Sequence, residues 1–497
     1  MAMHLSLIIG PAQLLHGKGR RRAASNDGMA EREGKDRVVE SFEIGDFRPG
    51  VRAKARCDLM GAAPYSEADD MLVRRFLTSA HDEALKTLAF WMEEAGMTAR
   101  RDHAGNLVGR YEGQTPNAPA LLIGSHIDSV RNGGRYDGAL GVMLGIDVVE
   151  ALARAGRRLP FAVEVIAFGD EEGSRFPASM TCSRAVAGTV SPSVMEMTDG
   201  DGVSLAEAFA TFGLDPTRLE EAARQPGEIL AFLEAHIEQG PVLEAEGLAL
   251  GVVTAIAAQK RLMVRFTGMA GHAGTTPMTL RKDPGPAAAE AVLALERICS
   301  GGADGLVGTV GRITALPGAF NVIPGAVEYS MDVRAEVAAT RDAAVEAVTA
   351  EIEAIAARRG LEVNVTLMQD LAASPCDPGL TALLEDAVAA TGQAPRRLPS
   401  GAGHDAMVIA DLCSTAMLFI RCEGGISHNP REAVTEADCA AAAQAMLGFV
   451  ERLSNQFSLS SRTSAKREGP GPTPERRASG GPGSAPGFAG LVRDDKV

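Results

Sequence analysis

The chain has 497 residues, 45% of them hydrophobic, which suffices for two or three domains with large buried cores. Its net charge of −15 at pH 7 and its aromatic content of 4% argue against nucleic acid as the main partner. No apolar run reaches the length of about 18 residues that a membrane span requires. Seven cysteines at scattered spacings, with no CxxC, fit free thiols in a reducing compartment. We therefore expect a cytoplasmic protein.

Both ends of the chain have the composition of disordered segments. Residues 1–50 are rich in charged and small side chains, and no acidic side chain occurs before Asp27. This absence of acids is a feature of transit peptides, but a non-functional extension or a start assigned too early is the preferred interpretation. Residues 456–497 shift to Ser, Gly, Pro and Arg, which predicts a disordered tail.

Alternating apolar segments in the first half predict a doubly wound α/β domain. Hydrophobic spacing predicts helices over 66–97 and 138–155, and short apolar runs predict buried strands over 118–123 and 161–168. Residues 200–233 are expected to be helical and connecting. Both strands end in polar loops, which is where open α/β sheets place their chemistry.

The pattern then changes to β-α-β-β-α-β, the order of a ferredoxin-like split fold. It predicts strands over 261–266, 307–316, 325–334 and 361–368, with helices over 283–299 and 339–358. We therefore expect a compact second domain at 259–372, inserted between the two parts of a mixed-sheet α/β domain at 51–258 and 373–455.

The stretch 123–138 is the first to suggest a metal site. His126 and Asp128 are two residues apart after the buried strand, so in extended chain their side chains lie on one face. Asp137 ends the glycine-rich loop that follows, and imidazole and carboxylate are common ligands of divalent ions. The alternative is a capped helix after a strand, with one unrelated histidine.

Four other stretches place polar residues beside Gly or Pro at the ends of predicted elements. They contain Glu171-Glu172, His236, His272 and His428. Each has a plain alternative: a solvated acidic pair, a hydrogen-bonded loop histidine, or a turn residue. Taken together, they offer the terminal ligands and bridging carboxylate that two divalent ions about 3.5–4 Å apart require. One of the two adjacent glutamates could then be a ligand and the other a base.

These stretches also carry a resemblance to a known family. The chain resembles the M20 metallopeptidase-like amidohydrolases, in the branch of N-carbamoyl-L-amino acid hydrolases, allantoate amidohydrolases and β-ureidopropionases. The resemblance covers about residues 55–455. The matching motifs are GSHIDSVRNGGRYDG (124–138), EEGSRF (171–176), AHIEQGP (235–241), GHAGTTPM (271–278), NVIPG (321–325), DVR (332–334), SGAGHDA (400–406) and SHNPRE (427–432).

The resemblance implies two divalent metal ions per subunit, with zinc or manganese first and cobalt or nickel as alternatives. His126, Asp137 and His236 would hold one ion. Asp137, Glu172 and His428 would hold the other, which makes Asp137 the bridging ligand.

The resemblance also implies roles for residues around the metals. Asp128 would orient His126, Glu171 would be the general base and later the acid, and His272 would polarise the scissile carbonyl. The remaining assignments concern the substrate. Asn321 and Arg334 would bind its carboxylate, Gln239 would hold the ureido end, and Gly403 would let the backbone approach.

The implied activity is hydrolysis of a linear ureido C–N bond in a small carboxylate-bearing substrate, with release of ammonia and carbon dioxide. Allantoate is the first substrate to consider, and an N-carbamoyl-L-amino acid is the second. A dipeptidase or aminoacylase of the same architecture is an alternative, as is a non-catalytic protein on a hydrolase scaffold. The resemblance also implies that the inserted domain at 259–372 forms a homodimer and closes as a lid over the catalytic domain, bringing in His272, Asn321 and Arg334.

Overall fold

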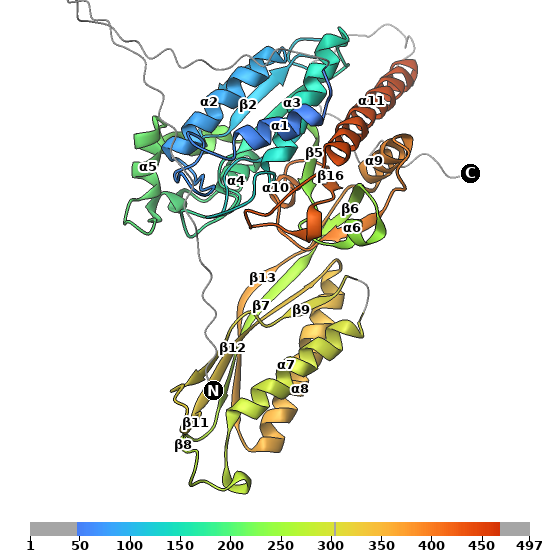
Figure 1. Cartoon of the computed structure of the whole chain (residues 1–497). Helices are drawn as coiled ribbons and strands as arrows, with labels where there is room; N and C mark the ends of the chain where they lie inside the picture. Colours follow the sequence, from blue (N-terminus) through green and yellow to red (C-terminus); the bar gives the residue numbers. More distant parts are fainter. Residues whose placement is uncertain (1–46, 303–304, 468–497) are drawn as a thin grey trace, which may run out of the picture. The chain divides into compact units, whose positions relative to one another are not determined.

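The computed structural model describes residues 47–302 and 305–467 (Figure 1). The sequence predictions for residues 1–46 and 468–497 lie outside this range. The strands form a nine-stranded sheet, a five-stranded sheet and a two-stranded ribbon. This mixed α/β architecture, with a second α+β layer inserted in the chain, confirms the predicted fold class.

The nine-stranded sheet is mixed and carries its parallel strands at the centre. Its order is β1-β2-β4-β3-β5-β16-β6-β14, with β15 also paired to β6. β4, β3, β5 and β16 run parallel to one another, and the pairs outside this group are mostly antiparallel. The strands are β1 (Thr98–Arg101), β2 (Leu107–Tyr111), β3 (Ala120–His126), β4 (Ala162–Phe168), β5 (Ile229–Ile237), β6 (Leu250–Ile256), β14 (Ser374–Pro375), β15 (Arg397–Ser400) and β16 (Thr415–Ile420).

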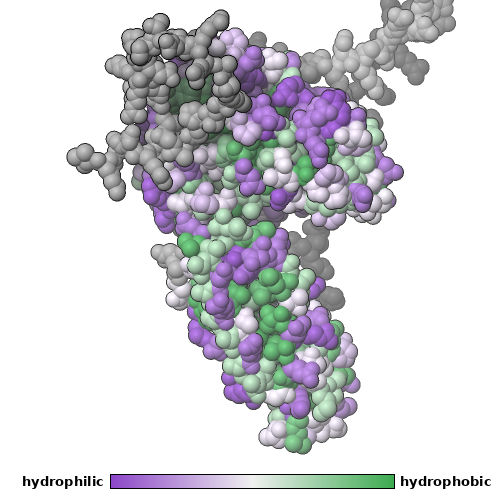
Figure 2. Space-filling model, turned by 180° about the vertical axis from the view of Figure 1, so that it is seen from behind, coloured by the Kyte–Doolittle hydropathy of each residue, from purple (hydrophilic) through white to green (hydrophobic). Residues whose placement is uncertain are grey.

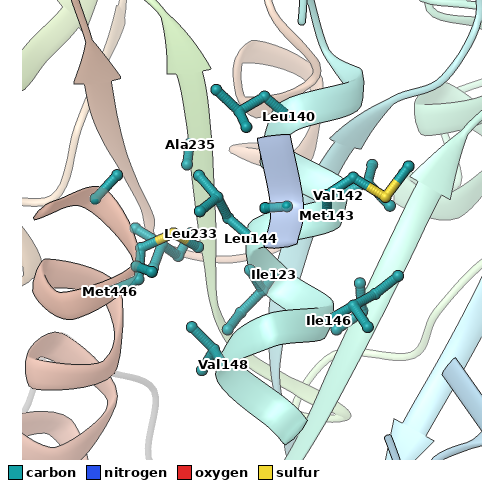
Figure 3. Packing of buried hydrophobic residues seen from close by; sticks show 14 of the residues in the cluster. Ile123, Leu140, Val142, Met143, Leu144, Ile146, Val148, Leu233, Ala235 and Met446 are labelled. Carbon is teal, nitrogen blue, oxygen red and sulfur yellow. The ribbon is translucent and has the colours of Figure 1, made fainter. Parts of the chain in front are cut away.

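Helices bury both faces of this sheet, which explains why the central strands are apolar throughout. One core joins it to α1 (Val51–Leu59), α2 (Ser79–Glu94), α3 (Ala139–Arg154), α9 (Pro378–Ala390) and α11 (Glu436–Arg467). The other joins it to α4 (Thr181–Ala187), α5 (Leu205–Phe212), α6 (Val242–Glu246) and α10 (Asp405–Ile409). Figure 3 shows side chains of α3, among them Leu144, between Ile123 of β3, Leu233 of β5 and Met446 of α11.

A buried ion pair attaches α1 to α3. Asp147 of α3 is fully buried, and its Oδ2 accepts the backbone N–H groups of Gly50 (2.8 Å) and Ala53 (3.1 Å). Its Oδ1 accepts from Arg56 Nη1 at 3.1 Å. The carboxylate therefore satisfies free N–H groups at the start of α1, which has no side-chain cap of its own, and also neutralises a buried guanidinium.

The five-stranded sheet has the order β10-β12-β7-β13, with β9 paired to β12. Buried and less buried residues alternate along β7 and β12, because α7 and α8 pack on one face only. Its elements are β7 (Ala258–Thr267), α7 (Pro284–Ser300), β9 (Val307–Thr309), β10 (Ile313–Leu316), β12 (Ala326–Ala335), α8 (Ala338–Arg359) and β13 (Glu362–Leu371). The ribbon pairs β8 (Gly271–His272) with β11 (Val322–Ile323).

Apolar side chains remain exposed on this inserted part. Ile313, Leu316, Phe320 and Leu367 are each more than one-third exposed. Figure 2 shows hydrophobic residues gathered over the lower half of the molecule as drawn. Patches of this kind are typical of interaction surfaces.

Three sequence expectations differ from the structure. Residues 66–78 form a loop that Ser66 closes through Val73 N–H and Met71 C=O, so α2 begins only at Ser79. Residues 229–233 belong to β5, since a short buried apolar run has the same signature in a strand and a helix. The segment predicted to be disordered from 456 begins inside α11, where the Phe457 ring lies 5.8 Å from that of Phe161.

The structure also bears on the predicted free thiols and on membrane-spanning helices. All seven cysteines are free thiols. Within residues 47–302 and 305–467, no helix is both long and apolar enough to cross a membrane. The predicted domain boundaries stay a prediction.

We expect Asp147→Ala to lower the free energy of unfolding by about 3–5 kcal/mol, because buried Arg56 would keep only its longer ion pair with Glu150 (3.8 Å) and the N–H groups of Gly50 and Ala53 would lose their acceptor. Urea unfolding followed by circular dichroism measures this loss. Glu67→Ala is the matched control, since it removes an exposed pair with Arg75 that should contribute at most about 1 kcal/mol. Equal losses in the two variants would contradict the role assigned to Asp147.

Candidate metal centre

Four neighbouring parallel strands deliver the predicted ligands to one edge of the nine-stranded sheet. β4, β3, β5 and β16 lie side by side in that order. His126 ends β3 and His236 lies at the end of β5, while Glu171-Glu172 and His428 follow β4 and β16 along the chain. The carboxyl ends of parallel strands meet at one edge, so residues 302 positions apart come together there although the five-stranded sheet lies between β5 and β16 in the chain.

Asp137 lies at the centre of this group. Its Oδ1 is 3.0 Å from His236 Nε2 and 3.5 Å from His126 Nε2. Its Oδ2 is 3.2 Å from His428 Nε2, which is itself 3.5 Å from Glu172 Oε2. The two oxygens of one carboxylate thus face two different sets of ligands.

The backbone after Asp137 requires a glycine. Gly138 has φ of +64°, a conformation that side chains rarely adopt. A Cβ at this position would also lie 2.4 Å from the His126 ring. Gly138 therefore lets the start of α3 pass directly beside the imidazole.

Side-chain geometry supports three overlapping sets of metal ligands among the described residues. His126, Asp137 and His236 form one set, and Asp137, Glu172 and His428 form another. A third combines His126 with Glu171 and Glu172. In addition, Glu172 Oε1 is buried and accepts no hydrogen bond. Imidazole nitrogens, carboxylates and a free buried oxygen fit a divalent cation.

The electrostatics of the group also favour a bound cation. Burial opposes the charge of Asp137, but hydrogen bonds from His126, His236 and His428 outweigh it and hold its pKa well below the usual range. Burial raises the pKa of Glu172 to about 7, and the Asp137 charge adds to this. The hydrogen bond to Asp137 raises the pKa of His428 to about 9, despite partial burial. Bound metal ions would replace these protons as the compensating positive charge.

Glu171 and Asp128 lie next to the ligands. Burial raises the pKa of Glu171 well above its usual range, which suits a group that must accept and return a proton. Asp128 Oδ1 is 3.4 Å from His126 Nδ1. The same carboxylate accepts the backbone N–H groups of Glu171 (3.1 Å) and Glu172 (3.2 Å). Asp128 therefore contacts both the β3 end and the glutamate pair.

Gln239, which is predicted to hold the substrate, makes hydrogen bonds to Asp137 and Ser427 in the structure. Its backbone has φ of +56°, and its Nε2 donates to Asp137 Oδ2 at 2.9 Å and to Ser427 Oγ at 3.1 Å. Its Oε1 is buried and has no hydrogen-bond partner. Gln239 thus holds the central carboxylate while its carbonyl oxygen is free to accept.

The predicted substrate residues of the inserted part do not join the group in this structure. His272 is exposed, and its Nδ1 accepts Gly274 N–H at 3.1 Å. The Asn321 carbonyl accepts Ala273 N–H at 2.9 Å, on the same ribbon. Over residues 47–302 and 305–467, neither His272 nor Asn321 forms a hydrogen bond or ion pair with the proposed ligands.

Arg334 lies at the end of β12 in the five-stranded sheet, and Gly403 lies in the loop between β15 and α10. Arg334 makes a two-pronged ion pair with Asp332 (2.9 and 3.0 Å) and donates to the Gly401 carbonyl at 2.5 Å. Gly403 lies on the same loop as Gly401, and a Cβ there would be 3.0 Å from Met180 Cε. Arg334 is therefore already paired with a carboxylate.

Sequence reasoning did not identify Arg74, which is buried and supports, through backbone contacts, the loop that follows β3 and carries Asp128 and Asp137. Its Nε donates to the Ile127 carbonyl at 2.5 Å, and its backbone exchanges hydrogen bonds with Ser129. No spacing in the sequence signals such contacts, since any residue can supply the backbone carbonyl.

Comparison with known proteins gives consistent similarities. A family model described as Peptidase family M20/M25/M40 matches residues 122–452. The N-carbamoyl-L-amino acid amidohydrolase of Geobacillus stearothermophilus is 43% identical over 384 residues, 77% of this chain and 93% of that protein. Allantoate deiminase 1 of Glycine max is 39% identical over 454 residues, 84% of this chain and 94% of that protein. The crystal structure of an amidase of the hydantoinase/carbamoylase family from Burkholderia multivorans matches with a TM-score of 0.76 and 33% identity, covering 82% of this chain and 98% of that one.

We expect divalent-ion binding near pH 7 to release protons, because the raised pKa of His428, about 9, keeps its ring protonated before the ion binds. Titration calorimetry of the metal-stripped protein, in two buffers of different ionisation enthalpy, counts these protons. His428→Ala should release about one proton fewer. An unchanged proton count in this variant would contradict a ligand role for His428.

Proposed function

Because the chain belongs to peptidase family M20/M25/M40, we propose that it is a metal-dependent hydrolase of linear ureido C–N bonds. The family resemblance inferred from the motifs is confirmed, and two of the relatives named above are an N-carbamoyl-L-amino acid amidohydrolase and an allantoate deiminase. The observation that carries the proposal is the position of Asp137 between two sets of ligands, with Glu171 beside them. It supports a two-metal site with one carboxylate left for proton transfer.

In the proposed mechanism, His126, Asp137, Glu172, His236 and His428 would hold a pair of divalent ions, which would supply Lewis acidity toward water and the scissile carbonyl. Glu171 accepts a proton from the attacking water and returns it to the leaving nitrogen. Asp128 keeps the His126 ring and the Glu171-Glu172 backbone in place. The carbamate released on cleavage breaks down to ammonia and carbon dioxide.

Gln239 is proposed to bind the ureido group through its unpaired Oε1, which can accept an N–H bond from the substrate. His272, Asn321 and Arg334 are proposed to act on the carbonyl and the carboxylate. Since His272 and Asn321 make no contact with the ligand group, this role requires a rearrangement of the inserted part or a second subunit. The exposed apolar residues of that part support a homodimer, which sedimentation equilibrium would test through the molecular mass.

Allantoate is the first substrate that we propose. In support, the soybean allantoate deiminase aligns with a larger share of this chain than the Geobacillus relative does. The higher identity of the N-carbamoyl-L-amino acid amidohydrolase favours its substrate class as the second candidate. Zinc and manganese are the metals to test first, with cobalt and nickel next.

A substrate panel with defined metals tests this proposal. We expect ammonia release from allantoate, and slower or no release from N-carbamoyl-L-alanine. The reverse order would favour the second candidate. Cleavage of dipeptides or N-acyl amino acids in preference to both would contradict a ureido hydrolase, and failure to cleave any ureido compound with metal bound would contradict the proposed function.

We expect Glu171→Gln to lower kcat by at least about 100-fold while both metal ions stay bound, because the amide cannot accept the proton of water. Steady-state rates and metal analysis of the same preparation measure the two effects. Glu112→Gln serves as the control, since Glu112 is an exposed acid paired with Arg110 and should leave both quantities unchanged. Loss of metal in Glu171→Gln would reverse the roles of the two adjacent glutamates.

A further inference from the structure

Glu432 is a buried acid that has no part in the mechanism above. Its side chain is 5% exposed, and among the described residues it forms no ion pair. Its Oε1 accepts the backbone N–H groups of Tyr136 (2.8 Å) and Asp137 (3.1 Å), which lie 296 and 295 residues earlier in the chain. Its Oε2 lies 3.2 Å from Ser427 Oγ. Burying a carboxylate without a neighbouring cation costs free energy, and the hydrogen bonds from the two backbone N–H groups offset part of that cost.

The loop that carries Asp137 is shaped to fit this carboxylate. A Cβ on Gly134 would lie 2.1 Å from Glu432 Cδ and 2.2 Å from its Oε1. Only glycine leaves room for the side chain at this point. Glu432 is therefore packed against the loop as well as hydrogen-bonded to it.

Glu432 also belongs to the turn that presents His428. Its backbone N–H donates to the Asn429 carbonyl at 3.0 Å, which closes the turn. His428 has φ of +53°, a conformation that a non-glycine residue keeps only when its surroundings hold it. Ser427, on the other side of His428, donates to Asp137 Oδ2 at 2.8 Å. The turn is thus tied to the Asp137 loop on both sides of the histidine.

We propose that Glu432 is a positioning residue that sets the distance between Asp137 and His428, and hence the affinity of the ion these two residues share. This inference rests on the proposed two-metal site. The other ion also uses Asp137, but its two histidine ligands, His126 and His236, lie on β3 and β5, whose register is fixed by the sheet. Loss of Glu432 should therefore weaken the ion at Glu172 and His428 much more than the other ion.

The test is a Zn²⁺ titration of the full metal-stripped chain, by calorimetry or against a chromophoric chelator. We expect two ions for the unaltered protein. Glu432→Ala should bind the ion at Glu172 and His428 about 10- to 100-fold more weakly, and its affinity for the other ion should change much less. Glu432→Gln should lose much less, because its amide oxygen can still accept both backbone N–H groups.

Asp438→Asn is the matched control. Asp438 is 2% exposed and lies six residues after Glu432 in the chain. It pairs with Arg421 rather than with the loop that carries Asp137. It should lower the melting temperature without changing either Zn²⁺ affinity. Gly134→Ala approaches the same contact from the loop, and it should reproduce the loss of the second ion even if Glu432→Ala does not fold.

The outcomes separate the two proposals. If the unaltered chain binds no Zn²⁺, the proposed metal site is wrong. If it binds two ions and Glu432→Ala and Gly134→Ala bind both as tightly, the positioning role is wrong. An equal loss in Asp438→Asn would also overturn that role, since it would show that lowered stability alone weakens the site.

Discussion

The proposed site depends on the meeting of four parallel strand ends at one carboxylate. β4, β3, β5 and β16 each bring or precede a ligand, and Asp137 reaches into the group from the loop before α3. Hydrogen-bond register between the strands fixes the relative heights of His126 and His236. One substitution can change the conformation of a loop, but the relative positions of His126 and His236 change only if the register of the strands changes. The geometry of the proposed site is therefore a property of the fold.

Charge balance is the second constraint. Burial makes several carboxylates in the group resist ionisation, as the raised pKa of Glu171 and Glu172 indicates. Asp137 is the exception, because three imidazoles donate to it. A site of this kind is stable only with compensating positive charge, from protons or from metal ions. This need for positive charge is consistent with a metal site, as expected for a member of peptidase family M20/M25/M40.

The sequence predicted the parts of this arrangement that follow from side-chain chemistry. Apolar runs ending in His126 and before Glu171 indicated strand ends, and the motifs indicated the other proposed ligands. The sequence could not predict contacts that act on backbone atoms, such as those of Arg74 with Ile127 and of Glu432 with Tyr136. A backbone N–H is the same for nearly every residue, so it leaves no pattern to detect. The position of His272 away from the proposed ligands could not be inferred either, because its motif carries no information on where the β8-β11 ribbon lies.

The proposed role of Asp137 as a bridge between two divalent ions can be tested with crystals of the full chain grown with Zn²⁺ and measured at the zinc absorption edge. We expect two anomalous peaks about 3.5–4 Å apart on either side of Asp137, one beside His126 and His236 and the other beside Glu172 and His428. A single peak held by His126, Glu171 and Glu172, with Asp137 uncoordinated, would contradict it.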